Sequence, residues 1–264
     1  RNPEVLGARA AEGFRGGISV STLGVGLDYN EDLMTKLADQ GGGRYHFIQG
    51  TEEIPRVLSD EFAGLVATVA AGITLEMRMA PGVELLKVYG YPTREENGVA
   101  KISVGSLAPK QVREIVVKLR VNFGPGEEAA LGVLALQASD LTRQGQKVES
   151  SLALAVATST DEAQIRASER TEVTIRVAEV ESAAQLEEAA RAVERGDYET
   201  ARKVLQASVE ALEVQQKATP SPKLVRQAKQ LKEAETELDA AKESAEMAKI
   251  YRKKTKATAY QVGK

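Results

Sequence analysis

The sequence predicts a chain of three parts: an α/β segment over residues 1–70, an antiparallel β-sandwich over residues 71–160 and a helical region over residues 161–264. Changes in the spacing of apolar residues indicate this division. The first part alternates helical and strand-like patterns, the second has apolar residues at every other position, and the third has apolar residues at helical spacing among Ala, Glu, Lys, Arg and Gln. The predicted fold class is therefore α/β plus all-β plus α.

The first part contains three helix-like patterns that alternate with two short apolar runs. The patterns lie at residues 4–14, 31–39 and 52–69, and the runs at residues 18–25 and 45–48. The last of these helices has one apolar face, which includes Ile54, Val57, Leu58 and Phe62. The order of elements predicts parallel strands joined by crossover helices. Because parallel strands are normally covered on both faces, two of them need a neighbour that shields them.

The second part has short strand candidates separated by turn signals such as Asn97-Gly98. The candidates lie at residues 73–79, 83–89, 100–104, 115–121, 130–138 and 151–156. Strands at this spacing are typical of an antiparallel sandwich.

The third part has an apolar stripe on each predicted helix. A Gly-Asp pair ends the first helix, and its Asp197 is the expected N-cap of the second. Two prolines within residues 219–222 precede a third helix, whose apolar stripe runs from Leu224 to Ala248. The basic end of the chain, residues 252–264, is expected to be frayed and solvated. The pattern predicts a helical hairpin or a small bundle.

The composition excludes several classes of site. The chain has no cysteine, which excludes disulfides, thiolate metal sites and cysteine catalysis. Its one histidine, His46, excludes a histidine-rich metal cluster and is expected to be packed or half-exposed. A net charge of −3 on a mixed surface gives no sign of nucleic-acid binding. No apolar run reaches the length of about 18 residues that a membrane span needs.

No catalytic residue is predicted. Adjacent acidic pairs, such as Glu52 with Glu53 and Glu95 with Glu96, lie in loops or helix starts. Paired carboxylates support acid–base chemistry where a cleft separates their pKa values, and nothing in the sequence indicates such a cleft. We therefore expect a protein that is not an enzyme.

Three polar residues after the first predicted strand are the candidate partner-binding site. Asp28, Tyr29 and Asn30 follow the run at residues 18–25. Ligands of open α/β sheets bind outside the carboxyl ends of the strands, which favours a docking role for these residues. The alternative is a loop that only caps the next helix.

Particular stretches carry a resemblance to a known family. The sequence Ile-Ser-Val-Ser-Thr-Leu-Gly-Val-Gly-Leu-Asp-Tyr-Asn-Glu-Asp-Leu-Met at residues 18–34 resembles the fifth strand and following helix of bacterial von Willebrand factor A (VWA) domains. Residues 38–48 are similar to the start of the family's final strand, and residues 53–65 to its closing helix. The later parts of the chain resemble the C-terminal extension of a bacterial subgroup, most clearly at residues 83–90, 106–121 and 195–205.

The resemblance implies that residues 1–70 are the C-terminal half of a VWA domain, with a Rossmann-like parallel sheet. In the family, an Asp-x-Ser-x-Ser motif and later Thr and Asp residues hold a divalent cation, usually magnesium. That motif is absent from this sequence, and a hard cation needs several oxygen ligands. We therefore predict no metal-binding residue and no cofactor here, with magnesium expected only where the missing half is present.

The resemblance also implies a function: protein–protein interaction or scaffolding, with metal-dependent ligand binding in the intact domain. The expected partners are other proteins or the missing VWA half. One alternative is a structural component that forms homo-oligomers by strand exchange or through its helical tail. Another is a regulatory subunit of an ATPase- or chelatase-like complex. The compartment stays open between the periplasm or cell surface and the cytoplasm.

Overall fold

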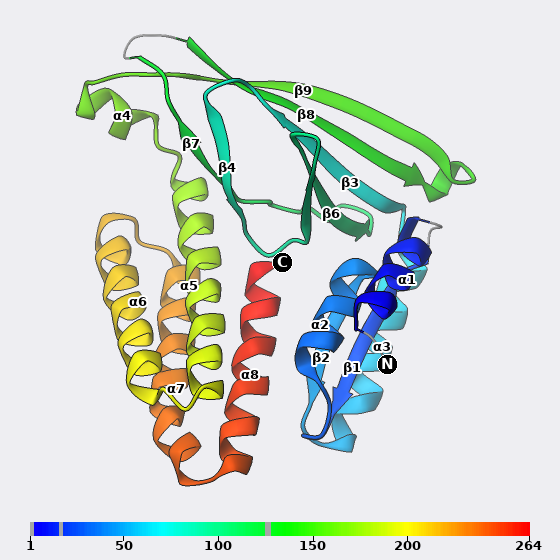
Figure 1. Cartoon of the computed structure of the whole chain (residues 1–264), viewed down its shortest axis with the longest axis vertical. Helices are drawn as coiled ribbons and strands as arrows, with labels where there is room; N and C mark the ends of the chain where they lie inside the picture. The colour runs from blue at the N-terminus through cyan, green and yellow to red at the C-terminus, as the bar shows by residue number, and fades with distance from the viewer. Residues whose placement is uncertain (1–2, 16–17, 125–127) are drawn as a thin grey trace. The chain divides into compact units, whose positions relative to one another are not determined.

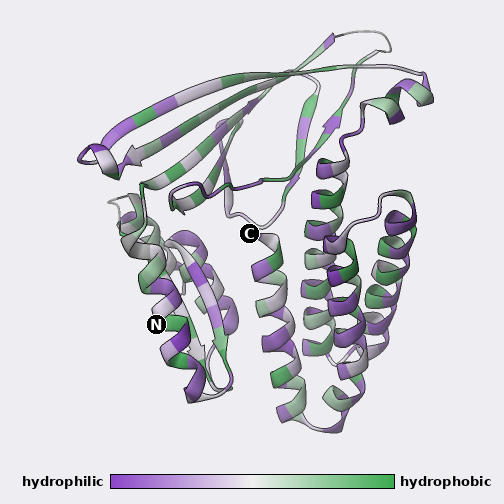
Figure 2. Cartoon of the chain, turned by 180° about the vertical axis from the view of Figure 1, so that it is seen from behind, coloured by the Kyte–Doolittle hydropathy of each residue, from purple (hydrophilic) through white to green (hydrophobic). Residues whose placement is uncertain are grey.

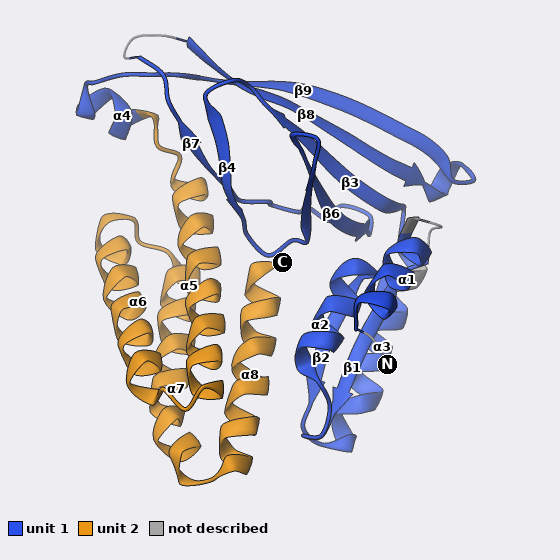
Figure 3. Cartoon of the chain, in the orientation of Figure 1, with its two compact units in different colours: residues 1–167 blue, residues 168–264 orange. Residues whose placement is uncertain are grey.

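The computed structural model describes residues 3–15, 18–124 and 128–264. The chain divides into two compact units, residues 1–167 and 168–264 (Figure 3). The first unit contains both the predicted α/β segment and the predicted β-rich segment. The second unit contains most of the predicted helical region.

The first unit begins with alternating helices and strands, in the predicted order (Figure 1). These elements are α1 (Pro3–Arg15), β1 (Val20–Val25), α2 (Glu31–Gln40), β2 (Gly42–Ile48), the 3-10 turn η1 (Thr51–Glu53) and α3 (Ile54–Val66). Strands β1 and β2 pair in parallel, with Val25 opposite Ile48. The prediction of parallel strands is therefore confirmed. Tyr45 and Ile48 are almost wholly buried and form the centre of this segment with Ala38.

The rest of the first unit is antiparallel, as predicted. Its strands are β3 (Ala70–Met79), β4 (Val83–Val88), β5 (Thr93–Glu96), β6 (Val99–Leu107), β7 (Val117–Val121), β8 (Glu128–Asp140) and β9 (Gln146–Ala157), with the turn η2 (Leu141–Arg143) before β9. One sheet has the order β5-β6-β3-β8-β9, and β4 pairs with β7 in a second sheet. Figure 2 shows hydrophilic and hydrophobic residues alternating along the long strands. The packing of the two sheets as a sandwich stays a prediction.

The parallel strands lie against the antiparallel sheet through two glycines. Gly105 of β6 has a φ of +103°, and a Cβ there would lie 2.9 Å from the carbonyl oxygen of Gly42 in β2. A Cβ on Gly42 would in turn collide with the ring of Phe14 from α1. Only glycine permits approaches as close as these, so β6 and α1 can pack directly against the start of β2.

The second unit is a bundle of four helices, α5 (Thr171–Glu194), α6 (Tyr198–Ala218), α7 (Pro222–Glu243) and α8 (Ala245–Gly263), preceded by the short α4 (Glu162–Ser168). Helices α5 and α7 each pack against both α6 and α8. The core holds Leu205, Leu224, Leu231 and Leu238, all fully buried. The Asp197 side chain accepts a hydrogen bond of 3.0 Å from the Thr200 amide, so its predicted role as N-cap of α6 is confirmed.

Two expectations for the end of the chain are wrong. The third helix, predicted to run to Ala248, ends before Ser244. The extended backbone of Ser244 starts α8, and its Oγ accepts a hydrogen bond from the Met247 amide. The end that was expected to be frayed is helical up to Gly263, and Lys253 is only 1% exposed. Basic residues of α8 contact α5: the Arg252 guanidinium lies 2.8 Å from a carboxylate oxygen of Glu194. Within the described ranges, no helix is both long and apolar enough to cross a membrane.

Candidate interaction site

The candidate site lies around β1, which has a hydrogen-bonded neighbour on one side only within the described residues. Ile18, just before this strand, is 66% exposed, and Val25 at its end is also exposed. On α3, Phe62 is 64% exposed, and Leu58 one turn earlier is exposed as well. Large apolar side chains exposed around an open strand edge are typical of a surface that another polypeptide covers.

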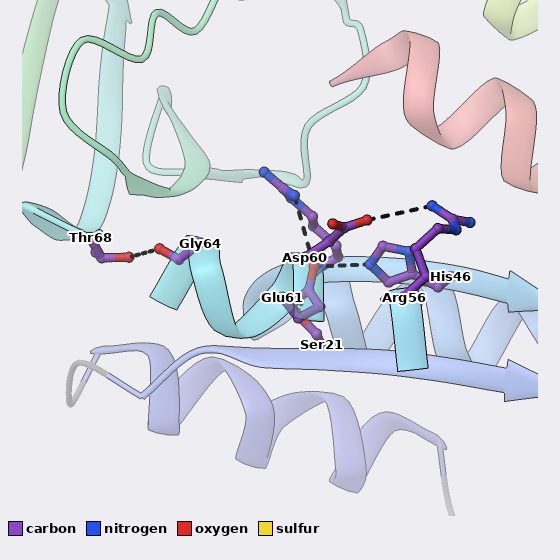
Figure 4. A network of polar contacts seen from close by, with 8 residues as sticks. Ser21, His46, Arg56, Asp60, Glu61, Gly64 and Thr68 are labelled. Atoms are coloured by element: carbon purple, nitrogen blue, oxygen red, sulfur yellow. Dashed lines mark hydrogen bonds and ion pairs between the residues drawn. The ribbon is translucent and has the colours of Figure 1, made fainter. Parts of the chain in front are cut away.

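A polar network fixes α3 to both parallel strands (Figure 4). The Ser21 hydroxyl of β1 donates a hydrogen bond to Glu61 Oε2 and accepts one of 3.1 Å from the Arg44 amide. The other carboxylate oxygen, Glu61 Oε1, lies 3.0 Å from His46 Nε2 of β2. The Arg44 guanidinium is 3.8 Å from the same oxygen. Glu61 thus joins three elements and determines how α3 lies on the strands.

The electrostatics of this network favour the charged carboxylate. The hydrogen bond from His46 lowers the pKa of Glu61 below its ordinary value, against the opposite effect of burial, and the Ser21 hydroxyl lowers it further. His46 itself is half-buried, in agreement with the expectation for this residue.

The way in which Ser21, His46 and Glu61 contact one another indicates a structural role and differs from that of a catalytic triad. In a nucleophilic triad the base contacts the serine hydroxyl and the acid contacts the far side of the base. Here the serine and the histidine bond to the two oxygens of one carboxylate. This arrangement holds Glu61 in place and gives Ser21 no contacting imidazole to take its proton.

The three residues predicted to bind a partner lie in the loop between β1 and α2. Asn30 is the N-cap of α2, because its side-chain oxygen accepts a hydrogen bond of 2.9 Å from the Leu33 amide. Tyr29 folds back over Gly24, where a Cβ would collide with the tyrosine ring, and its hydroxyl lies 2.8 Å from that of Tyr45. Asp28 is exposed. The capping alternative therefore describes Asn30, while the role of the loop in partner binding stays a prediction.

Burial controls the chemistry of the two tyrosines. It raises the pKa of Tyr45 far above its ordinary value, an effect that the hydrogen bond with Tyr29 increases. Burial also raises the pKa of Tyr29. Both hydroxyls therefore remain neutral near pH 7, and their contact fixes the loop after β1 to the middle of β2.

The residues that the structure describes hold no group of three or more His, Asp or Glu side chains placed to bind a metal ion. Sequence reasoning also did not find the Glu61 network. Ser21, His46 and Glu61 are far apart in the chain, and only the pairing of β1 with β2 brings Ser21 and His46 to the same face. The one usable signal was the acidic pair Asp60-Glu61, which interrupts the apolar pattern of the helix predicted at residues 52–69.

Comparisons with known proteins support the fold. No family model matches the chain. Over 96 residues, 36% of the chain, it is 30% identical to "Uncharacterized protein YfbK" of Escherichia coli strain K12, and this match covers 17% of that protein. A solved structure, von Willebrand factor type A from Catenulispora acidiphila, is similar over 90% of this chain with a TM-score of 0.63 and 18% identity. The chain has the fold of a VWA-type protein.

The VWA-type likeness extends beyond the parallel strands, because 90% of the chain is superimposed. The predicted resemblance is thereby confirmed at the level of the fold. This chain spans about half, 54%, of the length of the Catenulispora structure. Human COPII-coat protein Sec24c matches over 81% of this chain, at 15% identity and a TM-score of 0.49. The assignment of residues 1–70 to the C-terminal half of a VWA domain stays a prediction.

Proposed function

We propose that this chain is a non-enzymatic protein-interaction module whose α/β segment binds a further polypeptide along the open edge of β1. The observation that carries the proposal is the exposure of Ile18, just before an edge strand of the two-stranded parallel sheet, and of Phe62 on α3, next in the chain to Glu61, which contacts that strand. An unpaired strand edge offers amide and carbonyl groups to an added strand. The VWA-type fold supports an interaction role in general terms.

The proposed partner segment is a strand that pairs parallel to β1 and is followed by an apolar surface. Such a surface would cover Phe62 and Leu58 on α3, and complete burial of a large apolar side chain contributes about 1.5–3 kcal/mol. Asp28, exposed after the end of β1, would border the complex. In this proposal, the segment belongs to the first half of a VWA domain, on the same polypeptide or on another chain.

A selection experiment tests this proposal. The chain would be presented to a display library of random peptides long enough to form one strand, and the bound peptides would be assayed against two variants. We expect Phe62→Asp to weaken their binding by about tenfold or more, because it places a charge in an apolar contact. The control is Val214→Asp on α6, at a residue that is 67% exposed and belongs to the bundle. Peptides that bind both variants equally well would contradict the proposed surface.

The metal dependence expected of the family belongs, in this proposal, to the intact domain. A complete cation shell needs several oxygen ligands that the proposed partner segment would supply. We therefore expect titration of the chain with magnesium chloride in a calorimeter to give heats of dilution only. A tight, stoichiometric isotherm would overturn this part of the proposal.

A further inference from the structure

A second open edge lies in the antiparallel sheet of the first unit, on β9. This strand of 12 residues is the last in the order β5-β6-β3-β8-β9, so its described residues pair with β8 only (Figure 1). Natural edge strands are usually protected by charges, prolines or short length. The last eight residues of β9, at 150–157, are Ser, Leu, Ala and Val, with neither a charge nor a proline.

The exposed apolar residues of β9 have a symmetric spacing. Its three exposed large side chains are Val148, Leu152 and Val156, and Leu152 is 60% exposed. They are four residues apart, so they lie on one face of the strand. Leu152 is at the centre of the set. An antiparallel copy of β9 related by a two-fold axis at Leu152 would place Leu152 opposite itself and Val148 opposite Val156.

The charges of β9 are compatible with the same register. Lys147 and Glu149 would lie opposite Ala157 and Ala155 of the second copy, so no like charges would meet. Directly opposed like charges destabilise a strand pair, whereas paired β-branched and aliphatic side chains stabilise it. The register that joins the apolar residues is thus also free of charge repulsion.

We propose that β9 is a self-association edge, at which two copies of this chain pair antiparallel about Leu152 and form one continuous sheet. The pairing is isologous, so the same patch serves both copies and the contact closes at a dimer. This inference stands independently of the proposed partner surface at β1.

The size of the contact predicts a weak dimer. Eleven paired residues extend over about 37 Å, and a sheet about 10 Å thick then buries roughly 800 Å² in total. Stable protein–protein interfaces bury about 1,200–2,000 Å², and smaller ones are transient. We therefore expect dimers to form only at high protein concentration.

Sedimentation velocity over a micromolar to millimolar concentration series tests the association. We expect the species of 28.3 kDa to shift toward twice that mass as concentration rises. Leu152→Lys should raise the dissociation constant by about tenfold or more, because the two-fold axis would bring two lysines together. The matched control is Leu141→Lys, at an exposed residue of η2 outside β9, and it should leave the association unchanged.

Single cysteines test the register, since the natural chain contains none. Directly opposite Cβ atoms are about 4.5–5.5 Å apart, close to disulfide range. Under mild oxidation we expect Leu152→Cys to form a cross-linked dimer. Val148→Cys should not, because the two copies of residue 148 would lie about 27 Å apart.

Distinct outcomes would overturn the inference. A chain that stays monomeric over the whole series excludes the edge as a self-association site. Equal cross-linking of Leu152→Cys and Val148→Cys excludes the register. A dimer that is weakened by Phe62→Asp and unaffected by Leu152→Lys excludes β9 and assigns the contact to the surface at β1.

Discussion

The helical bundle buries all of its leucines and has valines such as Val214 among its exposed apolar residues, whereas the α/β segment leaves Leu58 and Phe62 exposed. The bundle encloses its leucines from all sides, and Leu205, Leu224, Leu231 and Leu238 have no exposed surface. The α/β segment buries Tyr45 and Ile48 to the same degree and yet leaves Ile18 and Phe62 almost two-thirds exposed. Both regions consist of amphipathic elements, so composition does not explain the difference.

The number of packing partners explains it. Each bundle helix packs against at least two others in a closed arrangement, so the apolar stripe of every helix meets another. In the α/β segment, two strands and three helices leave the outer edge of β1 unpaired among the described residues, and Leu58 and Phe62 of α3 exposed. A closed region is stable by its own packing, whereas an open one has contact residues available for another polypeptide.

The largest change in stability is expected for Leu231→Ala in the bundle core. Removing a fully buried leucine side chain leaves a cavity, and we expect the free energy of unfolding to fall by about 2–5 kcal/mol. Urea denaturation of the bundle, followed by circular dichroism, gives this value.

The counterpart is Phe62→Ala on α3. Phenylalanine is the larger residue, and in a closed core its removal would cost at least as much. Because it is mostly exposed here, we expect the free energy of unfolding to change by less than about 0.5 kcal/mol. A loss of unfolding free energy comparable to that of Leu231→Ala would mean that Phe62 is packed in a closed core and that the α/β segment has no open surface there.

An intermediate loss of stability is expected when the Glu61 network, which joins α3 to β1 and β2, is disrupted. In Glu61→Gln, the neutral amide replaces the carboxylate that contacts Ser21 and His46, and we expect a loss of about 1–3 kcal/mol near neutral pH. The lowered pKa of Glu61 stabilises the fold above the ordinary carboxyl value of 4.5. That contribution is lost as the pH falls through the lowered pKa, so the difference between the two proteins should vanish in acid.

The neighbouring Asp60→Asn is the control for this prediction. Asp60 pairs with Arg56 on the exposed side of α3, and such surface ion pairs contribute about 0–1 kcal/mol. Thermal unfolding of both variants over a pH series compares them. Equal effects of the two substitutions would remove the assigned role of the Glu61 network.

Local patterns allowed much of the fold to be predicted. The alternation of strands and helices before residue 70 and most antiparallel strands followed from apolar spacing. Strand β5 was missed because all four of its residues, Thr93–Glu96, are polar and exposed, and pairing with β6 alone defines it. The break at Ser244 was missed because the alanine stripe continues through it. Contacts with α5, such as that of Glu194 with Arg252, order a tail whose charges alone suggested fraying.

The candidate site was predictable only in part. The position of Asp28, Tyr29 and Asn30 after the first strand is a local fact that the sequence contains. The contacts of Glu61 with Ser21 and His46 span 40 and 15 residues and depend on strand register, which no local pattern determines. The same limit applies to the packing of Tyr29 on Gly24, which needs the loop to fold back over its own strand.

Substitutions at Asn30 and Asp28 separate the two interpretations of that loop. Asn30→Ala removes the hydrogen bond to the Leu33 amide, and loss of an N-cap costs about 1 kcal/mol. Asn30→Asp keeps an acceptor at the cap and a negative charge near the start of α2, so its stability should match that of the natural chain. If the loop only caps the helix, peptides selected against the chain should bind Asn30→Asp and Asp28→Ala with unchanged affinity. If the loop also contacts the partner, both variants should bind these peptides more weakly while Asn30→Asp retains full stability. Binding measurements made beside thermal unfolding therefore distinguish a residue that shapes the open edge from one that the partner contacts.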